Sequence, residues 1–231
     1  MSKKLFIIGT NTDVGKTYVT GLILKKLHDH GYKAAYYKAA ASGNEYDQNK
    51  QLIPGDCSFV KNVSKIDQSL DSMCPYLYKQ ALSPHLAAKL EGNPVELDTV
   101  LTGLEALYPN YDYITMEGSG GIICPIRDDE TKIWLTDIIK AGDFDCLLIS
   151  DASLGTINAT CLTISYLNSL NINVNGIIFN HFQPGNIMHE DNLKMCEKFT
   201  NVKVVATVKN NDTDLDLDLD KLIALYKKSE V

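Results

Sequence analysis

The sequence is poor in arginine. Among its 22 basic residues, only Arg127 is an arginine. Arginine forks are the usual clamp on phosphoryl groups, so this scarcity disfavours kinases that hold the transferred phosphate with lid arginines. No two of the six cysteines have the C-x-x-C spacing. That absence argues against zinc and iron–sulfur sites and favours small core residues in a reducing compartment.

Long apolar runs and an excess of positive charge are also missing. The run Leu5–Ile8 is too short for a signal peptide, and no stretch approaches the ~18 apolar residues that cross a bilayer. The 29 acidic residues outnumber the 22 basic ones, giving a net charge of −7, and an acidic chain repels nucleic acid and anionic lipid. These absences predict a cytoplasmic protein with neither nucleic acid nor membrane as partner.

Apolar residues are abundant enough for a substantial core, at 45% of 231 residues. No linker or repeat divides the chain, so we expect a single domain over residues 1–231. Short apolar runs of the kind that form buried parallel strands occur at Lys4–Gly9, Lys33–Lys38, Tyr111–Glu117, Asp145–Asp151, Val174–Asn180 and Val202–Val208. Helical spacing lies between them. The alternation predicts a doubly wound α/β fold of the P-loop NTPase type, with a mostly parallel sheet and helices on both faces.

Local signals predict where three helices begin. Asn93 and Pro94 would cap and start a helix at 97–104, and Ser83-Pro84 would start one over Pro84–Leu90. The tail alternates Asp and Leu, yet helical spacing favours a helix from about Asp218 through Lys228.

The segment Gly9–Thr17 follows an apolar run and precedes a helical pattern, which is the context of a phosphate-binding P-loop. Its backbone N–H groups would hold phosphates, Lys16 would reach the β and γ groups, and the Thr17 hydroxyl would ligate Mg²⁺. Five residues separate Gly9 from Gly15, where the common motif has four. A glycine-bounded strand-to-helix turn is the alternative interpretation.

Other strand ends carry charged residues that suit the same site. Glu117 closes an apolar run before a glycine-rich stretch and could ligate Mg²⁺, or be a solvated turn residue. Asp56 could be a second ligand or a helix cap. Lys38 would bring a cation to the P-loop if its strand lies beside the first, and otherwise is a surface lysine.

Six motifs in order resemble the ATP-dependent dethiobiotin synthase family over nearly the whole chain; they lie at residues 9–17, 37–43, 55–56, 83–85, 117–121 and 154–158. The longer P-loop is itself the form that this family has. The resemblance implies a ligase that joins 7,8-diaminononanoate and CO₂ into a cyclic urea while ATP becomes ADP and phosphate. Mg²⁺ is the implied cofactor and ATP the co-substrate.

The resemblance also implies roles for individual residues. The catalytic residues would be Lys38, Lys16 and Thr12, with Lys38 facing the carbamate and the γ-phosphate. The nucleotide would contact Asp13, Val14, Gly15, Lys16, Thr17, Tyr18, Asp56, Glu117, Gly118, Ser119, Gly120, Asn180 and His181. Of these, Asn180 would read adenine, and Thr17, Asp56 and Glu117 would hold the metal. The diamine would contact Thr12, Ser42, Ser83, Pro84, Gly120 and Asn158.

Two departures from the family pattern concern the base and its neighbourhood. Val208-Lys209 stands where the family usually has Ile-Pro, and Ala39 stands in place of a proline. We therefore expect looser selection of adenine.

The motif at 154–158 resembles the segment that lies at the family's two-fold interface, where a helix start binds the diamine carboxylate of the opposite subunit. We expect a homodimer with a shared site; an ordinary helix covering its own sheet is the alternative.

Other functions for the same fold are a partitioning-type or assembly-type P-loop ATPase switch, a small-molecule kinase and a non-catalytic nucleotide-binding module. Thr10-Asn11, where such ATPases carry a lysine, and the acidic tail disfavour the first of these.

Overall fold

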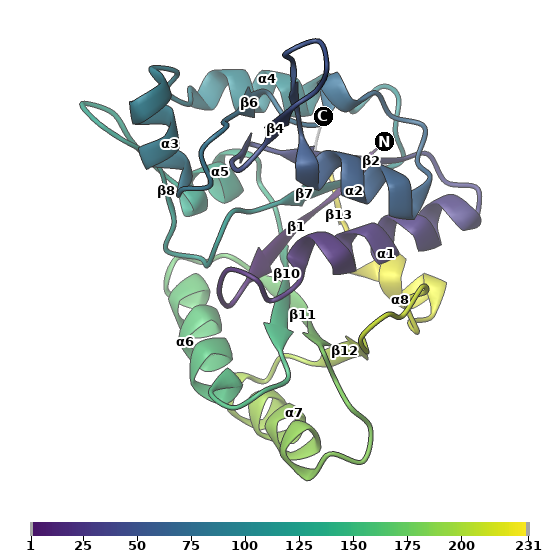
Figure 1. Ribbon diagram of the computed structural model, residues 1–231. Coiled ribbons are helices and arrows are strands. Elements are labelled where there is room, and N and C mark those ends of the chain that lie inside the picture. Colours follow the sequence, from purple (N-terminus) through teal and green to yellow (C-terminus); the bar gives the residue numbers. More distant parts are fainter. Residues whose placement is uncertain (1, 230–231) are drawn as a thin grey trace.

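A computed structural model describes residues 2–229. Their central element is a seven-stranded sheet, in which six parallel strands follow the order β12-β11-β10-β1-β7-β2 and a short seventh strand pairs antiparallel with β1 (Figure 1). The parallel strands are β1 (Lys3–Gly9), β2 (Ala34–Lys38), β7 (Tyr113–Glu117), β10 (Cys146–Asp151), β11 (Val174–Asn180) and β12 (Val204–Thr207). Each of the six apolar runs is a strand, and the bounds differ from those expected by at most two residues. The doubly wound fold is confirmed.

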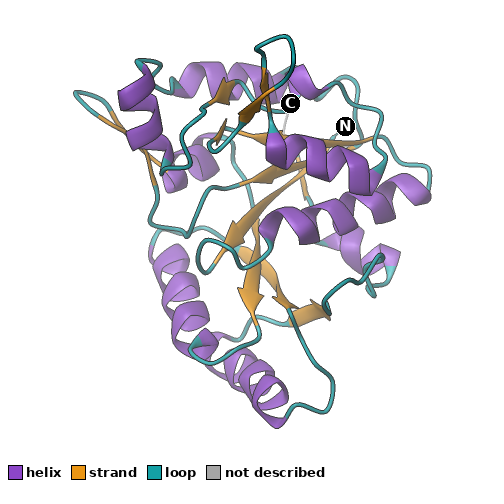
Figure 2. Ribbon diagram, in the orientation of Figure 1, coloured by secondary structure: helices purple, strands orange, loops and turns teal. Residues whose placement is uncertain are grey.

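Helices cover both faces of the sheet (Figure 2). One face carries α1 (Lys16–Asp29), α2 (Gly55–Ser64) and α8 (Leu219–Ala224); the other carries α3 (Pro84–Glu91), α4 (Leu97–Glu105), α5 (Leu135–Ala141), α6 (Thr156–Ser169) and α7 (Ile187–Thr200). Side chains alternate along β1. Leu5 and Ile7 therefore pack on the face covered by α1, α2 and α8, whereas Phe6 and Ile8 pack on the opposite face. No helix within residues 2–229 is long and apolar enough to span a bilayer.

Strand β2 forms one edge of the sheet, and the segment that includes the 3₁₀ turn η1 (Leu70–Ser72) covers that edge. The Tyr36 N–H donates to Gln68 Oε1 over 2.8 Å, and Gln68 Nε2 donates back to the Tyr36 carbonyl over 3.0 Å. The Lys38 N–H donates to the Met73 carbonyl over 2.9 Å. A side-chain amide and a loop carbonyl thus replace a neighbouring strand.

Two expectations about helix ends are wrong. Helix α8 ends at Ala224 rather than reaching Lys228, because Lys227 and Lys228 form strand β13 and pair antiparallel with the first residues of β1. That part of β1 is open for pairing, since β10 begins alongside only at Phe6. Likewise, Asn93 is not the cap of α4, whose N-cap is Glu96; the Asn93 N–H instead donates to Ala88 O at the end of α3.

Three short strand pairs have no counterpart among the expected strands. Strand β3 (Ala40–Ala41) pairs with β6 (Tyr76–Leu77), β4 (Glu45–Tyr46) with β5 (Leu52–Ile53), and β8 (Pro125–Asp128) with β9 (Lys132–Trp134). These pairs shape the loops beyond the carboxyl ends of β2 and β7, where an α/β sheet binds its ligands.

Candidate active site

The loop from Gly9 to Lys16 connects β1 to α1 as a P-loop does. Gly15 precedes the helix with a φ of 85°, in the left-handed region that glycine tolerates. Lys16 curls back over the loop, and its Nζ donates to the Asn11 carbonyl over 3.0 Å. Burial of Lys16, with the Lys38 charge adding to it and Glu117 opposing it, lowers the pKa of the Lys16 ammonium. A phosphate would relieve this penalty on the charged form.

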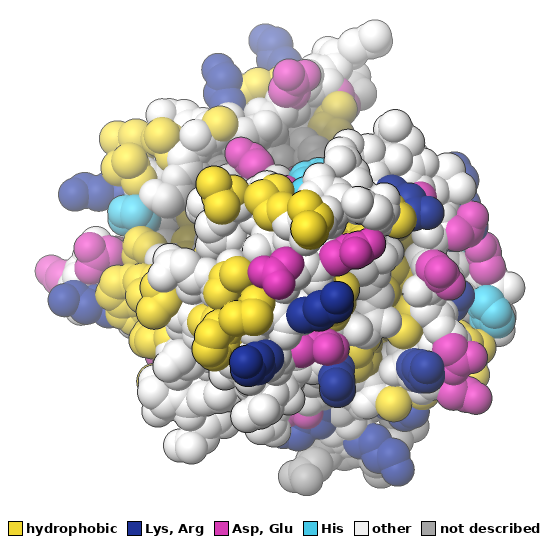
Figure 3. Space-filling view, turned by 90° about the horizontal axis from the view of Figure 1, so that it is seen from below, with side chains coloured by type: hydrophobic (Ala, Val, Ile, Leu, Met, Phe, Trp, Pro, Cys, Tyr) yellow, Lys and Arg dark blue, Asp and Glu magenta, His cyan; other side chains and the backbone are white. Residues whose placement is uncertain are grey.

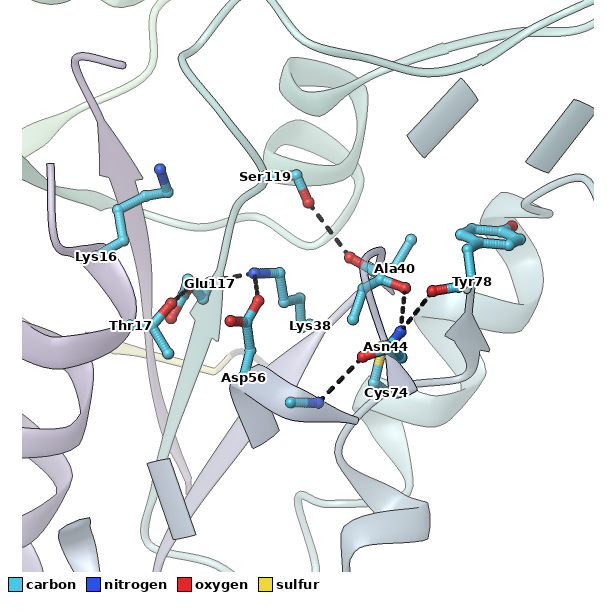
Figure 4. Close-up of polar contacts among 12 residues, drawn as sticks. Lys16, Thr17, Lys38, Ala40, Asn44, Asp56, Cys74, Tyr78, Glu117 and Ser119 are labelled. Carbon is cyan, nitrogen blue, oxygen red and sulfur yellow. Dashed lines mark hydrogen bonds and ion pairs between the residues drawn. The ribbon is translucent and has the colours of Figure 1, made fainter. Parts of the chain in front are cut away.

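Strand register brings Lys38 and Glu117 together, because the two residues are paired across β2 and β7. Lys38 Nζ lies 2.5 Å from Asp56 Oδ2 and 3.0 Å from Glu117 Oε1 (Figure 4). Burial disfavours the Lys38 charge, but the two carboxylates more than offset this and raise the pKa of Lys38 above its ordinary value. Asp56 reaches this cluster from the first turn of α2. Lys38 is therefore a buried, charged group and not a surface lysine.

Glu117 has one carboxylate oxygen to spare. Its Oε1 accepts from the Thr17 hydroxyl over 2.8 Å as well as from Lys38, whereas Oε2 is buried and has no hydrogen-bond partner. A buried carboxylate oxygen without a partner is costly. Hard divalent cations prefer carboxylate and hydroxyl oxygens, so Thr17, Asp56 and Glu117 fit Mg²⁺ completed by water and phosphate. The described residues contain no group of three or more His, Cys, Asp or Glu side chains that could hold a metal by themselves.

A cavity of about 1030 Å³ opens beside this cluster. Most of the expected site residues line it: Thr12, Asp13, Gly15, Lys16, Thr17, Lys38, Ser42, Asp56, Ser83, Pro84, Glu117, Ser119 and Gly120. The P-loop, the loop after β2, the start of α3 and the loop after β7 thus surround one space. Such a space is large enough for a triphosphate beside a small organic substrate.

Val14, Tyr18, Gly118, Asn158, Asn180 and His181 do not line the cavity. Gly118 packs inward, where an added Cβ would approach Leu135 and Phe6 to about 3 Å. The Tyr18 hydroxyl donates to the Asp212 carbonyl. Asn158 is exposed in the first turn of α6.

Asn180 lies behind the P-loop at the end of β11. Its Nδ2 donates to the Val14 carbonyl over 3.0 Å, and a Cβ at Gly15 would sit 2.0 Å from the same nitrogen. The Asn180 Oδ1 atom is buried without a partner. His181 lies within 3.2 Å of Asn180 Nδ2 through Nε2 and within 2.5 Å of Asp151 Oδ2 through Nδ1. The tautomer with its proton on Nδ1 would let His181 donate to Asp151 through Nδ1 and accept from Asn180 through Nε2.

Comparison with known proteins identifies the family. The ATP-dependent dethiobiotin synthetase BioD of Brachyspira hyodysenteriae is 47% identical over 217 residues, covering 94% of this chain and 96% of that protein. The enzyme of the same name from Clostridium novyi is 42% identical over 234 residues, with 99% and 97% covered. The chain belongs to the dethiobiotin synthetase family. A family model described as "AAA domain" also matches residues 3–215.

Solved structures share the fold of this dethiobiotin synthetase family member at low sequence identity. MinD in the MinC:MinD cell division complex of Aquifex aeolicus has a TM-score of 0.57 at 14% identity, covering 91% of this chain and 82% of that one. The MinD of Pyrococcus horikoshii has a TM-score of 0.53 at 14% identity, with the same coverage. These likenesses confirm the P-loop NTPase fold alone. The close sequence relatives decide between a synthetase and an assembly ATPase.

Several cavity residues of this synthetase were absent from the expected set. Asn11 lies within the P-loop motif, so the motif itself could have indicated it. Ala40 and Gly121 lie within the motifs at 37–43 and 117–121, which could likewise have indicated them. Ala81 and Leu82 precede Ser83-Pro84, and Ile123, Cys124 and Pro125 follow the glycine-rich stretch. These five carry no chemical signal in sequence, because loop geometry alone brings them to the cavity.

Proposed function

We propose that the chain catalyses the ATP-dependent closure of 7,8-diaminononanoate and CO₂ to dethiobiotin. Dethiobiotin synthetase activity, a ligase activity, follows from the family. The observation that carries the detailed proposal is the buried Lys38 ammonium, held between Asp56 and Glu117 on the cavity that the P-loop also lines. Two lysines, Lys38 and Lys16, thus line one cavity.

The reaction takes three steps. One substrate amine adds to CO₂ and loses a proton, giving a carbamate. A carbamate oxygen then attacks the γ-phosphorus of ATP and ADP leaves. The second amine finally attacks the activated carbonyl carbon, the urea ring closes and phosphate leaves.

Phosphoryl transfer needs positioning and charge neutralisation more than a protein nucleophile. We assign the phosphates to the P-loop N–H groups, to residues Asp13 to Tyr18 and to Lys16. Lys38 would neutralise charge on the carbamate and the γ-phosphoryl group. Support for this division comes from the cavity, which Lys16 lines from the start of α1 and Lys38 from the end of β2.

We assign Mg²⁺ to Thr17, Asp56 and Glu117. When bound, Mg²⁺ neutralises charge on the phosphate oxygens. The buried Glu117 Oε2 without a partner supports this assignment. In the unliganded protein Lys38 balances the two carboxylates instead, and Lys38 becomes available to substrate when another cation takes part of that role.

Thr12, Ser42, Ser83, Pro84 and Gly120 would contact the diamine, since they line the cavity together with Lys38. Asn180 and His181, which lie outside this cavity, would contact adenine. The buried Asn180 Oδ1 has no hydrogen-bond donor, and the exocyclic amine of adenine would supply one.

The decisive test is phosphate release measured with MgATP, bicarbonate and the diamine, each omitted in turn. We expect turnover only with all three and one dethiobiotin formed per ADP. Hydrolysis at the same rate without the diamine would favour an ATPase switch. Tight MgATP binding with no turnover under any condition would indicate a nucleotide-binding module.

We further propose a homodimer in which Asn158 completes the diamine site of the neighbouring subunit. Asn158 is exposed and lies outside its own cavity, at the start of α6 where free N–H groups favour a carboxylate. Nearby, Leu154 is 87% exposed and Leu162 is 63% exposed. Figure 3 views the side on which α6 and α7 lie, and hydrophobic side chains gather there in separate groups. Burial in a dimer would remove such surface from water.

Complementation tests the shared site. Mixed dimers of Lys38→Ala and Asn158→Ala chains should regain activity, because one of their two sites has both parent residues. Native mass spectrometry would verify mixing. Mixed dimers no more active than the separate variants would refute the shared site.

A cytoplasmic location is also proposed, supported by the six free cysteines.

A further inference from the structure

Asn44 is a buried amide beside the cavity, two residues after Ser42. Its side-chain nitrogen donates to the Ala41 carbonyl over 2.8 Å and to the Tyr78 carbonyl over 2.9 Å. Its side-chain oxygen accepts the Gly55 N–H over 3.0 Å. Figure 4 shows this amide with dashed lines to its three partners.

Each of the three partners is adjacent in sequence to a cavity wall. Ala41 precedes Ser42, Gly55 precedes Asp56, and Tyr78 is followed a few residues later by the wall from Ala81 to Pro84. The backbone adds two bonds of its own, from Asn44 N–H to Tyr78 O over 3.1 Å and from Tyr78 N–H to Ala41 O over 2.8 Å. Gly55, however, contacts this assembly through the Asn44 side chain.

The chemistry of the joint requires an amide. The Ala41 and Tyr78 carbonyls, each already bonded to a backbone N–H, accept a second hydrogen bond here, and the Gly55 N–H needs an acceptor; among short side chains only Asn offers both functions. An aspartate would accept from Gly55 but could not donate to both carbonyls. An alanine would remove these hydrogen bonds from the buried Ala41 and Tyr78 carbonyls and from the Gly55 N–H.

We infer that Asn44 is a positioning residue that fixes Asp56 and the diamine walls relative to Lys38. This inference rests on the proposed function, in which Asp56 holds Mg²⁺ and residues 42 and 83–84 contact the diamine. Asn44 does not itself line the cavity. It acts through α2, whose first turn carries Asp56, and through the two loops that its nitrogen joins.

Substitution of Asn44 should change two properties separately. In Asn44→Ala, Gly55 at the start of α2 loses its hydrogen bond to the residue 44 side chain. Mn²⁺ binding in the presence of ADP, followed by electron paramagnetic resonance, should therefore weaken about 10-fold, as is usual when a group supporting metal ligands is lost. The KM for the diamine should also rise, whereas the KM for ATP should stay within about twofold because the P-loop is untouched. In Asn44→Asp, the Gly55 bond persists, so the diamine KM should rise with Mn²⁺ affinity near the parent value.

Asn192 provides a matched control. It too is buried, and its side-chain nitrogen donates to two backbone carbonyls, those of Ala152 at 3.0 Å and Ser153 at 3.2 Å. Neither Asn192 nor these two partners line the cavity. Asn192→Ala should lower the melting temperature much as Asn44→Ala does while leaving Mn²⁺ affinity unchanged.

The outcomes separate the inference from the proposed function. Folded Asn44→Ala protein with Mn²⁺ affinity and diamine KM within about twofold of the parent would overturn the inference, and so would an equal Mn²⁺ effect in Asn192→Ala. If Asn44→Ala does not fold, an unchanged diamine KM in Asn44→Asp overturns it. Failure of the parent protein to consume the diamine would instead refute the proposed function, and hydrogen exchange at residues 55–57 would still report the tie to α2.

Discussion

Removal of the Lys38 charge should slow the reaction far more than it weakens nucleotide binding. Lys38 Nζ contacts Asp56 Oδ2 at 2.5 Å and Glu117 Oε1 at 3.0 Å, and the side chain is only 7% exposed. A preorganised donor facing developing charge in such a site contributes about 3–4 kcal/mol to the transition state. Lys38→Ala should therefore lower kcat about 10²- to 10³-fold. The KM for ATP should change little, because Lys16 and the P-loop still hold the phosphates.

The unliganded protein should also lose stability. Without Lys38, the fully buried Glu117 keeps only the Thr17 hydroxyl as a partner, and unpairing a buried ion pair costs about 3–5 kcal/mol, less here because Asp56 is 39% exposed. Thermal melting with and without Mg²⁺ measures this loss of stability in Lys38→Ala, and Mg²⁺ should restore part of the lost stability. A coupled phosphate-release assay measures kcat. A Lys38→Ala enzyme within about twofold of the parent kcat would refute the catalytic role, since that corresponds to less than about 1 kcal/mol.

Three further predictions concern the P-loop and the base. Gly15→Ala should reduce ATP affinity and melting temperature more than Gly31→Ala does. Both glycines have left-handed φ values, 85° and 81°, but of the two only Gly15 has an atom in the way of an added Cβ, Asn180 Nδ2 at 2.0 Å. Equal effects in a paired melting experiment would contradict this prediction. The KM for ATP should rise at alkaline pH as Lys16, whose pKa burial lowers, loses its proton, and Lys16→Arg should move that rise to higher pH; identical pH profiles would exclude Lys16 as the group. GTP or CTP should support measurable turnover because Lys209 replaces the family's proline, and strict rejection of both in parallel saturation curves would show that Asn180 and its neighbours suffice.

The fold and the cluster around Lys38 could be predicted because both depend on local signals. Continuous apolar runs mark strands buried on both faces, and polar residues at their carboxyl ends meet at one edge of a parallel sheet. Lys38 and Glu117 stand at strand ends as this logic predicts, but β2 does not lie beside β1 as the expectation for Lys38 required. Strand β7 lies between them, and the pairing of Lys38 with Glu117 across β2 and β7 brings the lysine to the site.

What the sequence did not reveal depends on contacts distant along the chain. Asn44 looks like one more loop asparagine until Gly55 and Tyr78 are brought to it. The spacing of apolar residues in the tail predicts a helix through Lys228. It gives no sign that Lys227 and Lys228 pair with the start of β1 instead. Pairing partners of this kind cannot be inferred from periodicity.

The Gln68 amide at the edge of β2 bears on how the protein avoids aggregation. An open edge strand is a template on which a second chain can add by strand pairing. Gln68 occupies both backbone groups of Tyr36, and Met73 takes the N–H of Lys38. Self-association by sheet extension is therefore blocked along β2, the strand that ends in Lys38. Any contact between copies through this edge would first have to displace the Gln68 side chain.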